Sequence, residues 1–247
     1  MREVILALKN KLVVFEGLDG AGKSTLIKLF KEELLQRHQN VTVTREPGGT
    51  ELGEELRQII LRRDKEAPSP RTELLLYEAI RAQHVEKLIR PKLNQGEWVL
   101  CDRFSASSIA FQAGGRKIAE EDVKWLNSFA TDNLTAGVTI LLDLTYDEAK
   151  QRQAHRFESK GEMADRMEAE ARDFHERVRD SFLKQAQEAK DISSQNSIHF
   201  SPSKDESSER HSKNSFSQWI VLSAMQSPES LLSSLIQKLK EQGLWEF

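Results

Sequence analysis

The sequence has almost no cysteine, no long apolar run and no excess of charge of either sign. Its 247 residues contain one cysteine, Cys101, so an internal disulfide is excluded. Lys and Arg total 36 and Asp and Glu total 39, which gives a net charge of -3. This balance argues against a general binder of nucleic acids or membrane surfaces, because such proteins carry basic patches. A local basic pocket for a small anion is compatible with it.

The apolar runs are too short for a membrane protein. None reaches the ~18 residues that a bilayer-spanning helix needs. The first residues, MREVILALKNKLVVF, become charged too soon for a signal peptide. Together with the single cysteine, these absences favour a protein of the reducing cytoplasm. Cys101 lies within the apolar run WVLCDRF, so we expect a buried strand residue and not a nucleophile.

Five apolar stretches rich in β-branched residues predict buried strands, and helical patterns lie between them. Alternation of strands and helices is typical of crossover units and a parallel sheet, and continuous apolar strands fit a sheet covered on both faces. The predicted strands are residues 11–17, 41–47, 97–103, 138–144 and 218–224, and the predicted helices are residues 23–37, 52–62, 70–89 and 120–129.

Two polar regions follow the fourth predicted strand. Residues 146–186 are strongly charged and are predicted to be helical. Residues 188–217 are rich in Ser, Lys and Glu with few apolar anchors, which predicts an exposed, mobile loop. A functional loop is the alternative, although no motif spacing occurs in this segment.

The stretch FEGLDGAGKST carries a phosphate-binding motif. Residues 17–24 have the form G-x-x-x-x-G-K-S between a predicted strand and a predicted helix. Glycines permit tight turns that aim backbone N–H groups at one anion, and the helix dipole adds positive potential. Lys23 suits the β and γ phosphates of a nucleoside triphosphate, and Ser24 suits a magnesium ion. These residues leave open why an acid, Asp19, stands among phosphate-binding groups.

Two further polar clusters end predicted strands, where open α/β sheets bind their ligands. They are TREPGGT (44–50) and CDRFSASSIAFQAGGR (101–116). Asp102 is placed to reach a magnesium ion, and Arg103 offers a planar fork of donors for phosphate. The alternatives are a helix cap for Asp102 and a salt bridge for Arg103, but the phosphate loop favours catalysis.

The predicted helix at 70–89 adds a ring and a cation, Tyr77 and Arg81, which share one helix face. They could stack on a base and donate to its edge. The residues alone favour a simpler interpretation, in which Tyr77 is core and Arg81 is surface.

As a set, these segments resemble the thymidylate kinase family of nucleoside monophosphate kinases, of the bacterial type with a basic lid. The matching pieces are FEGLDGAGKST, REPGGTELGEELR, LLLYEAIRAQHVEKLIRPKL, VLCDRFSASSIAFQ and ADRMEAEARDFHERVRDSF. They cover most of residues 11–186, with the closing strand and helix at 218–240. The resemblance implies one domain over residues 1–247 with a three-layer α/β phosphate-loop fold, a parallel five-stranded sheet, a helical lid at about 150–168 and a polar insert at 188–217.

The resemblance also implies ATP-dependent phosphorylation of dTMP to dTDP, for dTTP synthesis, with Mg²⁺. Asp19 would then accept a hydrogen bond from the 3′-hydroxyl of dTMP. The ATP-binding residues would be Gly17, Leu18, Asp19, Gly20, Ala21, Gly22, Lys23, Ser24 and Thr25, and the magnesium ligands Ser24 and Asp102. The dTMP-binding residues would be Asp19, Arg45, Pro47, Tyr77, Arg81, Arg103, Ser107, Ser108, Phe111 and Gln112, and the catalytic residues Lys23, Arg103, Arg156 and Arg166.

In this implied acceptor pocket, Tyr77 would stack on thymine and Arg81 would donate to thymine O4. An arginine only donates, so it suits the carbonyl of thymine and not the amino group of cytosine. Phe111 stands where bacterial members often carry Tyr, so the hydrogen bond of a phenol is missing there. The bond between Glu46 and Pro47 would be cis.

Gly20 stands where some members of the family carry an arginine. This chain resembles the members without that arginine, in which lid arginines neutralise the charge of the transferred phosphoryl group. The lid offers Arg152, Arg156, Lys160 and Arg166, of which we favour Arg156 and Arg166. The alternative is a solvated helix face.

The resemblance implies a cytoplasmic homodimer that binds ATP and dTMP, with no nucleic acid or membrane partner. Three alternatives remain at this point. One is a kinase of another nucleoside monophosphate or of a deoxynucleoside. Another is a nucleotide-dependent switch, which would need no acceptor pocket. The third is a kinase-like chain whose long insert serves a partner.

Overall fold

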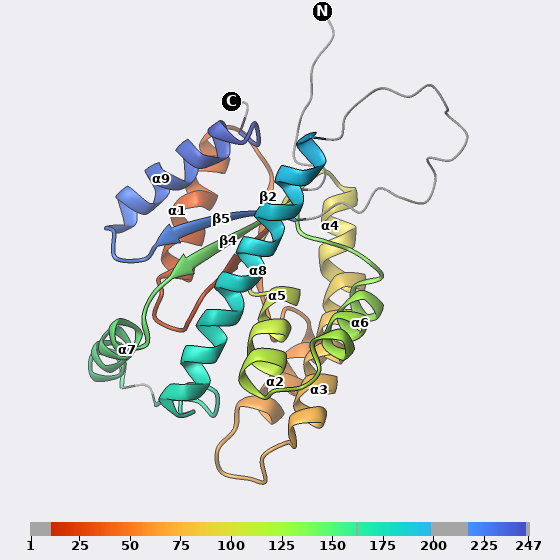
Figure 1. Cartoon of the computed structure of the whole chain (residues 1–247), viewed down its shortest axis with the longest axis vertical. Helices are drawn as coiled ribbons and strands as arrows, with labels where there is room; N and C mark the ends of the chain where they lie inside the picture. The colour runs from red at the N-terminus through yellow and green to blue at the C-terminus, as the bar shows by residue number, and fades with distance from the viewer. Residues whose placement is uncertain (1–10, 162, 199–216, 246–247) are drawn as a thin grey trace, which may run out of the picture.

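A computed structural model of the chain describes residues 11–161, 163–198 and 217–245, and in it one parallel sheet forms the centre of the fold (Figure 1). The strand order is β2-β3-β1-β4-β5. All five predicted strands are confirmed, as β1 (Leu12–Glu16), β2 (Val41–Arg45), β3 (Trp98–Asp102), β4 (Val138–Asp143) and β5 (Gln218–Ser223).

The predicted helices are confirmed as well, and the long pattern at 70–89 is an α-helix continued by a π-helical turn. The first helices are α1 (Lys23–Gln36), α2 (Glu51–Leu61), α3 (Pro70–His84), η1 (Val85–Ile89) and α4 (Arg90–Asn94). The later ones are α5 (Ser105–Ser108), η2 (Ile109–Gly115), α6 (Glu120–Thr131), α7 (Tyr146–Lys160), α8 (Arg172–Ile198) and α9 (Pro228–Glu241).

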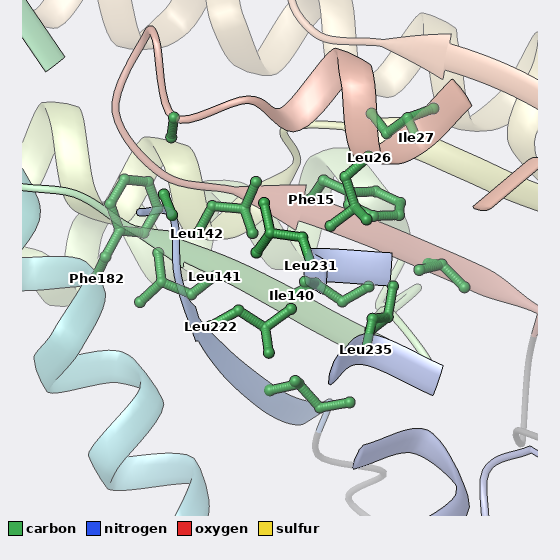
Figure 2. Close-up of a cluster of buried hydrophobic side chains, with 14 of the residues drawn as sticks. Phe15, Leu26, Ile27, Ile140, Leu141, Leu142, Phe182, Leu222, Leu231 and Leu235 are labelled. Carbon is green, nitrogen blue, oxygen red and sulfur yellow. The ribbon is translucent and has the colours of Figure 1, made fainter. Parts of the chain in front are cut away.

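Both faces of β1 are buried, which explains why its sequence is continuously apolar. Val13 and Phe15 belong to a core cluster with side chains of α1 and α9, whereas Leu12 and Val14 belong to a second cluster with side chains of η1. Figure 2 shows the first cluster, where leucine and phenylalanine side chains from several elements meet. The sheet therefore has a helical layer on each side, as the predicted three-layer fold requires. Cys101 is buried in β3, as predicted.

The strand register gathers polar strand ends at one edge of the sheet. Phe15 of β1 pairs with Asp102 of β3, and Arg45 of β2 pairs with the same Asp102. The segments that follow β1, β2 and β3 therefore begin side by side, at the carboxyl-end edge of the sheet. These are the phosphate loop and the two polar clusters that the sequence places after strands.

The prediction of a loop over residues 188–217 is wrong for its first part, because α8 continues to Ile198. Side-chain hydrogen bonds one helical turn apart accompany this continuation, such as Gln187 to Asp191 at 2.7 Å. Residues 199–216 lie outside the described part of the chain. The charged region at 146–186 is helical as predicted, but a turn separates α7 from α8.

Among the described residues, no helix combines the length and the apolar character needed to cross a membrane.

Candidate active site

A cavity of about 500 Å³ lies at the carboxyl ends of β1, β2 and β3. It brings together most of the residues predicted for the site: Asp19, Gly20, Gly22, Lys23, Ser24, Thr25, Arg45, Pro47, Tyr77, Arg81, Asp102, Arg103, Ser107, Ser108, Phe111, Gln112 and Arg156. Four predicted residues do not line it, namely Gly17, Leu18, Ala21 and Arg166. Leu18 and Ala21 are buried beneath the phosphate loop.

The phosphate loop turns sharply between β1 and α1. Gly17 has a φ of 133°, and a Cβ there would lie 2.4 Å from the carbonyl oxygen of Leu142, so only glycine fits. The side chain of Lys23 is buried at the junction of loop and helix. Its Nζ donates to the carbonyl oxygens of Gly17 and Leu18, both at 3.2 Å. The loop thus holds its own cation at the cavity wall.

Ser24 and Asp102 meet at one point of the cavity. The Ser24 hydroxyl donates to the Asp102 carboxylate at 3.3 Å, and Lys23 Nζ lies 4.0 Å from the same carboxylate. A hydroxyl and a carboxylate are the oxygen ligands that Mg²⁺ accepts, with water and phosphate oxygens completing its shell. No group of three or more His, Cys, Asp or Glu suited to a metal occurs among the described residues. The hydroxyl of Ser24 and the carboxylate of Asp102 fit the ligands that a protein supplies to a magnesium ion.

Asp19 is neutralised within the loop. Arg103 donates to its carboxylate at 2.7 Å, and Lys23 lies 3.6 Å away. Burial opposes the charge of Asp19, but the charges of Arg103 and Lys23 outweigh it and lower the pKa of Asp19 below its usual value. The salt bridge considered for Arg103 is therefore present, and its side chain lines the cavity as well.

Glu16, which the sequence analysis missed, organises the backbone that carries Arg103. Its side chain is fully buried and accepts from the backbone N–H groups of Phe104 at 2.9 Å and Ser107 at 3.2 Å, and from the Ser107 hydroxyl at 2.6 Å. Arg103 itself has a left-handed φ of 72°, which an L residue rarely adopts. Burial raises the pKa of Glu16 to about 7, against the opposing charge of Arg103.

Tyr77 and Arg81 form one wall of the cavity, so the interpretation of Arg81 as a surface residue is wrong. Arg81 is 1% exposed and donates to Glu46 at 2.8 Å, to Glu78 at 2.6 Å and to Ser108 at 2.8 Å. Burial works against its charge, but the two glutamates outweigh it and raise the pKa of Arg81. Tyr77 is half-buried, and its burial raises the pKa of the phenol.

Helix η2, whose wide π turn carries Phe111 and Gln112, also lines the cavity. Such turns recur at functional sites. The guanidinium of Arg103 lies 4.9 Å from the centre of the Phe111 ring. The peptide bond between Glu46 and Pro47, on the β2 side of the cavity, is cis as predicted.

The lid helix α7 rests on the phosphate loop. Arg152 donates to Gly20 O at 3.4 Å and to Ala224 O at 2.7 Å, and Gln153 donates to Asp19 O at 2.8 Å. A Cβ on Gly20 would lie 3.0 Å from the carbonyl oxygen of Ala149, so glycine permits this approach.

The two favoured lid arginines lie in different places. Arg156 lines the cavity and donates to Glu168 at 2.5 Å. Arg166 lies behind the lining, where it pairs with Glu73 at 2.7 Å and donates to Ile60 O at 2.8 Å.

Six cavity residues were not among the predicted site residues, namely Glu46, Arg57, Leu61, Arg152, Asp165 and Met167. Arg57 donates to Pro47 O at 2.7 Å, and burial together with the charge of Arg45 lowers its pKa. Arg57 lies within REPGGTELGEELR, one of the segments that resemble the thymidylate kinase family. This position was the signal in the sequence that could have identified Arg57 as a site residue. Burial raises the pKa of Asp165 above its usual value.

The strand ends thus surround one volume with a phosphate loop on one side and a wall of ring and amide groups on the other. With the parallel sheet and the helical lid, this is the fold of the phosphate-loop nucleoside monophosphate kinases. A thymidylate kinase family model matches residues 15–203, and the chain belongs to this family.

Individual relatives agree. A thymidylate kinase of Bdellovibrio bacteriovorus is 50% identical over 233 residues, which covers 94% of this chain and 97% of the relative. A thymidylate kinase of Pelobacter propionicus is 44% identical over 70% of this chain and 80% of its own length. One from Thermoanaerobacter sp. is 44% identical over 73% of this chain and 86% of its own length.

Proposed function

We propose that this chain transfers the γ-phosphoryl group of ATP to dTMP and forms dTDP. The observation that carries the proposal is the single cavity in which the phosphate loop and the wall of Tyr77 and Gln112 face one volume. In such a volume, donor and acceptor phosphates would meet without crossing solvent. Phosphoryl transfer then depends mainly on positioning and on neutralising charge.

ATP would bind along Gly17–Thr25, with Lys23 at its terminal phosphates. Ser24 and Asp102 would hold Mg²⁺ with the phosphate oxygens. When bound, the ion supplies positive charge that neutralises the phosphates. Arg103, Arg45 and Arg57 line the acceptor side, and their charges suit the phosphate of dTMP.

The thymine base would stack on Tyr77, with Ser107 and Ser108 completing its pocket. The nitrogen atoms of Arg81 already bond protein acceptors. A hydrogen bond from Arg81 to thymine O4 would therefore use an N–H group that also donates to a protein acceptor. The buried positive charge of Arg81 would favour the carbonyl of thymine at position 4 of the base over the amino group of cytosine. Asp19 would accept from the 3′-hydroxyl of the sugar.

The lid would exclude water, which would otherwise hydrolyse ATP. Arg156 at the cavity wall would add a cation to the transferred group, and Arg166 would act from behind the lining. We also propose that the protein is a cytoplasmic homodimer without nucleic acid or membrane partners.

An assay of ATP consumption with dTMP, dUMP, dCMP and thymidine tests this function. We expect dTMP to be the best acceptor and dCMP to be poorer by about a hundredfold in kcat/KM, since loss of one charged contact costs about 2–3 kcal/mol. Equal use of dCMP would contradict the acceptor assignment. Hydrolysis of ATP that no acceptor accelerates would favour the switch.

A further inference from the structure

Glu73 is a buried carboxylate that stands directly behind the acceptor pocket. It lies on α3, one helical turn before Tyr77, and is 0% exposed. It does not line the cavity. Its contacts nevertheless connect a cavity residue, Gln112, with Arg116 and with Arg166 of the lid segment.

The groups around Glu73 all donate to it. Gln112 Nε2 lies 2.9 Å from Glu73 Oε1, and Arg116 donates to the two carboxylate oxygens at 3.1 and 3.0 Å. Arg166 Nη1 lies 2.7 Å from Oε2. As a carboxylate, Glu73 only accepts hydrogen bonds, and the amide and the two guanidinium groups around it supply the donors.

An acceptor-only partner fixes the orientation of the Gln112 amide. If the amide were turned over, its oxygen would face the Glu73 carboxylate, and two acceptors would meet in a buried place. The nitrogen therefore faces Glu73, and the planar amide directs Oε1 to the other side. Gln112 is one of the cavity-lining residues, so this oxygen is the group that it offers to a base.

We propose that Glu73 is a positioning residue for base selection: it holds the Gln112 amide so that the carbonyl oxygen meets a base edge that carries an N–H. This inference rests on the proposed function, in which the base is thymine. Thymine has a hydrogen on N3 and donates to Gln112 Oε1. Cytosine has a lone pair on N3, which that oxygen repels. Selection at N3 is then separate from the selection at position 4 by Arg81.

The experiment compares dTMP with 5-methyl-dCMP in the full-length enzyme. The two acceptors share the methyl group and the sugar phosphate and differ only at position 4 and N3. In Glu73→Gln, the partner of Gln112 can donate as well as accept, so the amide is free to turn. We expect the ratio of kcat/KM for dTMP to that for 5-methyl-dCMP to fall about 10- to 100-fold, mostly through a higher KM for dTMP.

Two further variants separate this role from a structural one. Arg166→Ala removes another partner of Glu73 but leaves Gln112 bonded, so any loss should affect both acceptors equally and leave their ratio unchanged. Gln112→Met removes the amide, so it should lower the ratio by itself, and adding Glu73→Gln should then change the ratio no further.

An unchanged ratio in Glu73→Gln, or a further fall of the ratio in the double variant, would overturn the proposal. If Glu73→Gln does not fold, an unchanged ratio in Gln112→Met would overturn it alone. A wild-type enzyme that phosphorylates both acceptors equally would refute base selection but keep the kinase. No phosphorylation of either acceptor would refute the proposed function together with this inference.

Discussion

At the scale of the residue, the charged groups of this site are held by partners of opposite charge before any ligand binds. Asp19 stands among phosphate-binding groups, yet its carboxylate contacts Arg103 and Lys23 and so does not present an isolated charge to a phosphate. Arg81 is held in the same way by Glu46 and Glu78. Arg81 is thus oriented by two buried acids, and Lys23 and Arg103 are oriented by the part-buried Asp19, which fixes the geometry of these groups.

Lys23 is the residue with the clearest expected effect. Lys23→Ala should lower kcat by about 10³-fold, since it removes a preorganised cation from the developing phosphoryl charge. The control is Lys28→Ala, which changes an exposed lysine of the same helix. Steady-state kinetics and thermal melts of both variants measure the effect. A Lys23→Ala enzyme with near-normal kcat would contradict the role of the phosphate loop.

Glu16 should make the stability of the ligand-free protein fall as the pH rises. Its pKa is raised from 4.5 to about 7, so the folded protein keeps a proton that the unfolded chain has already lost. The stabilising contribution of Glu16 is therefore fully present below pH 4.5. About 3 kcal/mol of the free energy of unfolding is lost as the pH rises from 4.5 through 7.

Glu16→Gln, which is neutral at every pH, tests this. Urea unfolding at pH 5 and pH 8 should show a larger loss of stability for the wild type than for the variant, by about 2.5 kcal/mol. Equal losses in the two proteins would show that Glu16 does not titrate in this window.

The sequence predicted those site positions that lie in motifs with fixed spacing. Asp102 ends β3, and the phosphate loop and Arg103 follow directly after strands, so the sheet alone brings them to one edge. Glu16 and Glu73 were missed, because no local pattern tells which distant donors a single carboxylate will meet. Their partners come from segments remote in the sequence, and only the folded chain brings them together.

At the scale of the element, the lid helix α7 is seated on the phosphate loop through backbone acceptors. Arg152 and Gln153 bond carbonyl oxygens of Gly20 and Asp19, so the position of the lid depends on the shape of the loop. The absence of a side chain at Gly20 makes this approach possible. An arginine at this position, as in some family members, would meet α7.

The two favoured lid arginines should differ in their effects. Arg156→Ala should lower kcat by about 10²- to 10³-fold with little change in the KM for ATP, because a cavity-lining cation acts mainly in the transition state. Arg166→Ala should lower kcat less, because Arg166 lies behind the lining. Kinetics of both single variants with saturating dTMP decide this. An equal or larger loss for Arg166→Ala would place the catalytic cation there instead.

Helix α8 shows why sequence reasoning failed for one element. The segment EAKDISSQNSI has few apolar residues, which predicted a loop, but it follows a helix whose earlier turns are anchored in the core by Phe174, Val178 and Phe182. Once a helix is nucleated, each further residue adds a hydrogen bond at little cost. Composition indicates whether a segment can start a helix and does not indicate where a started helix ends.

At the scale of the whole molecule, one apolar surface has no partner within the described part of the chain. Trp125 and Phe129 of α6 are 66% and 76% exposed, and their rings stack with centres 5.9 Å apart. Asn127, between them in sequence, faces inward and accepts from Arg81 at 2.7 Å. The exposed pair therefore lies on the outer side of a helix whose inner side contacts Arg81 of the cavity wall. Large exposed rings of this kind are typical of protein interfaces.

The proposed homodimer should depend on this aromatic pair. Phe129→Asp places a charge in the centre of the apolar surface, where burial against a second subunit would leave it unpaired, so we expect dimer dissociation to become at least about a hundredfold more favourable. The control is Leu35→Asp, an exposed leucine likewise near the end of its helix, on α1 across the sheet. Sedimentation velocity at micromolar concentration should give a dimer for the wild type and the control and a monomer for Phe129→Asp. A wild-type monomer would refute the dimer, and a dimeric Phe129→Asp would move its interface to another surface.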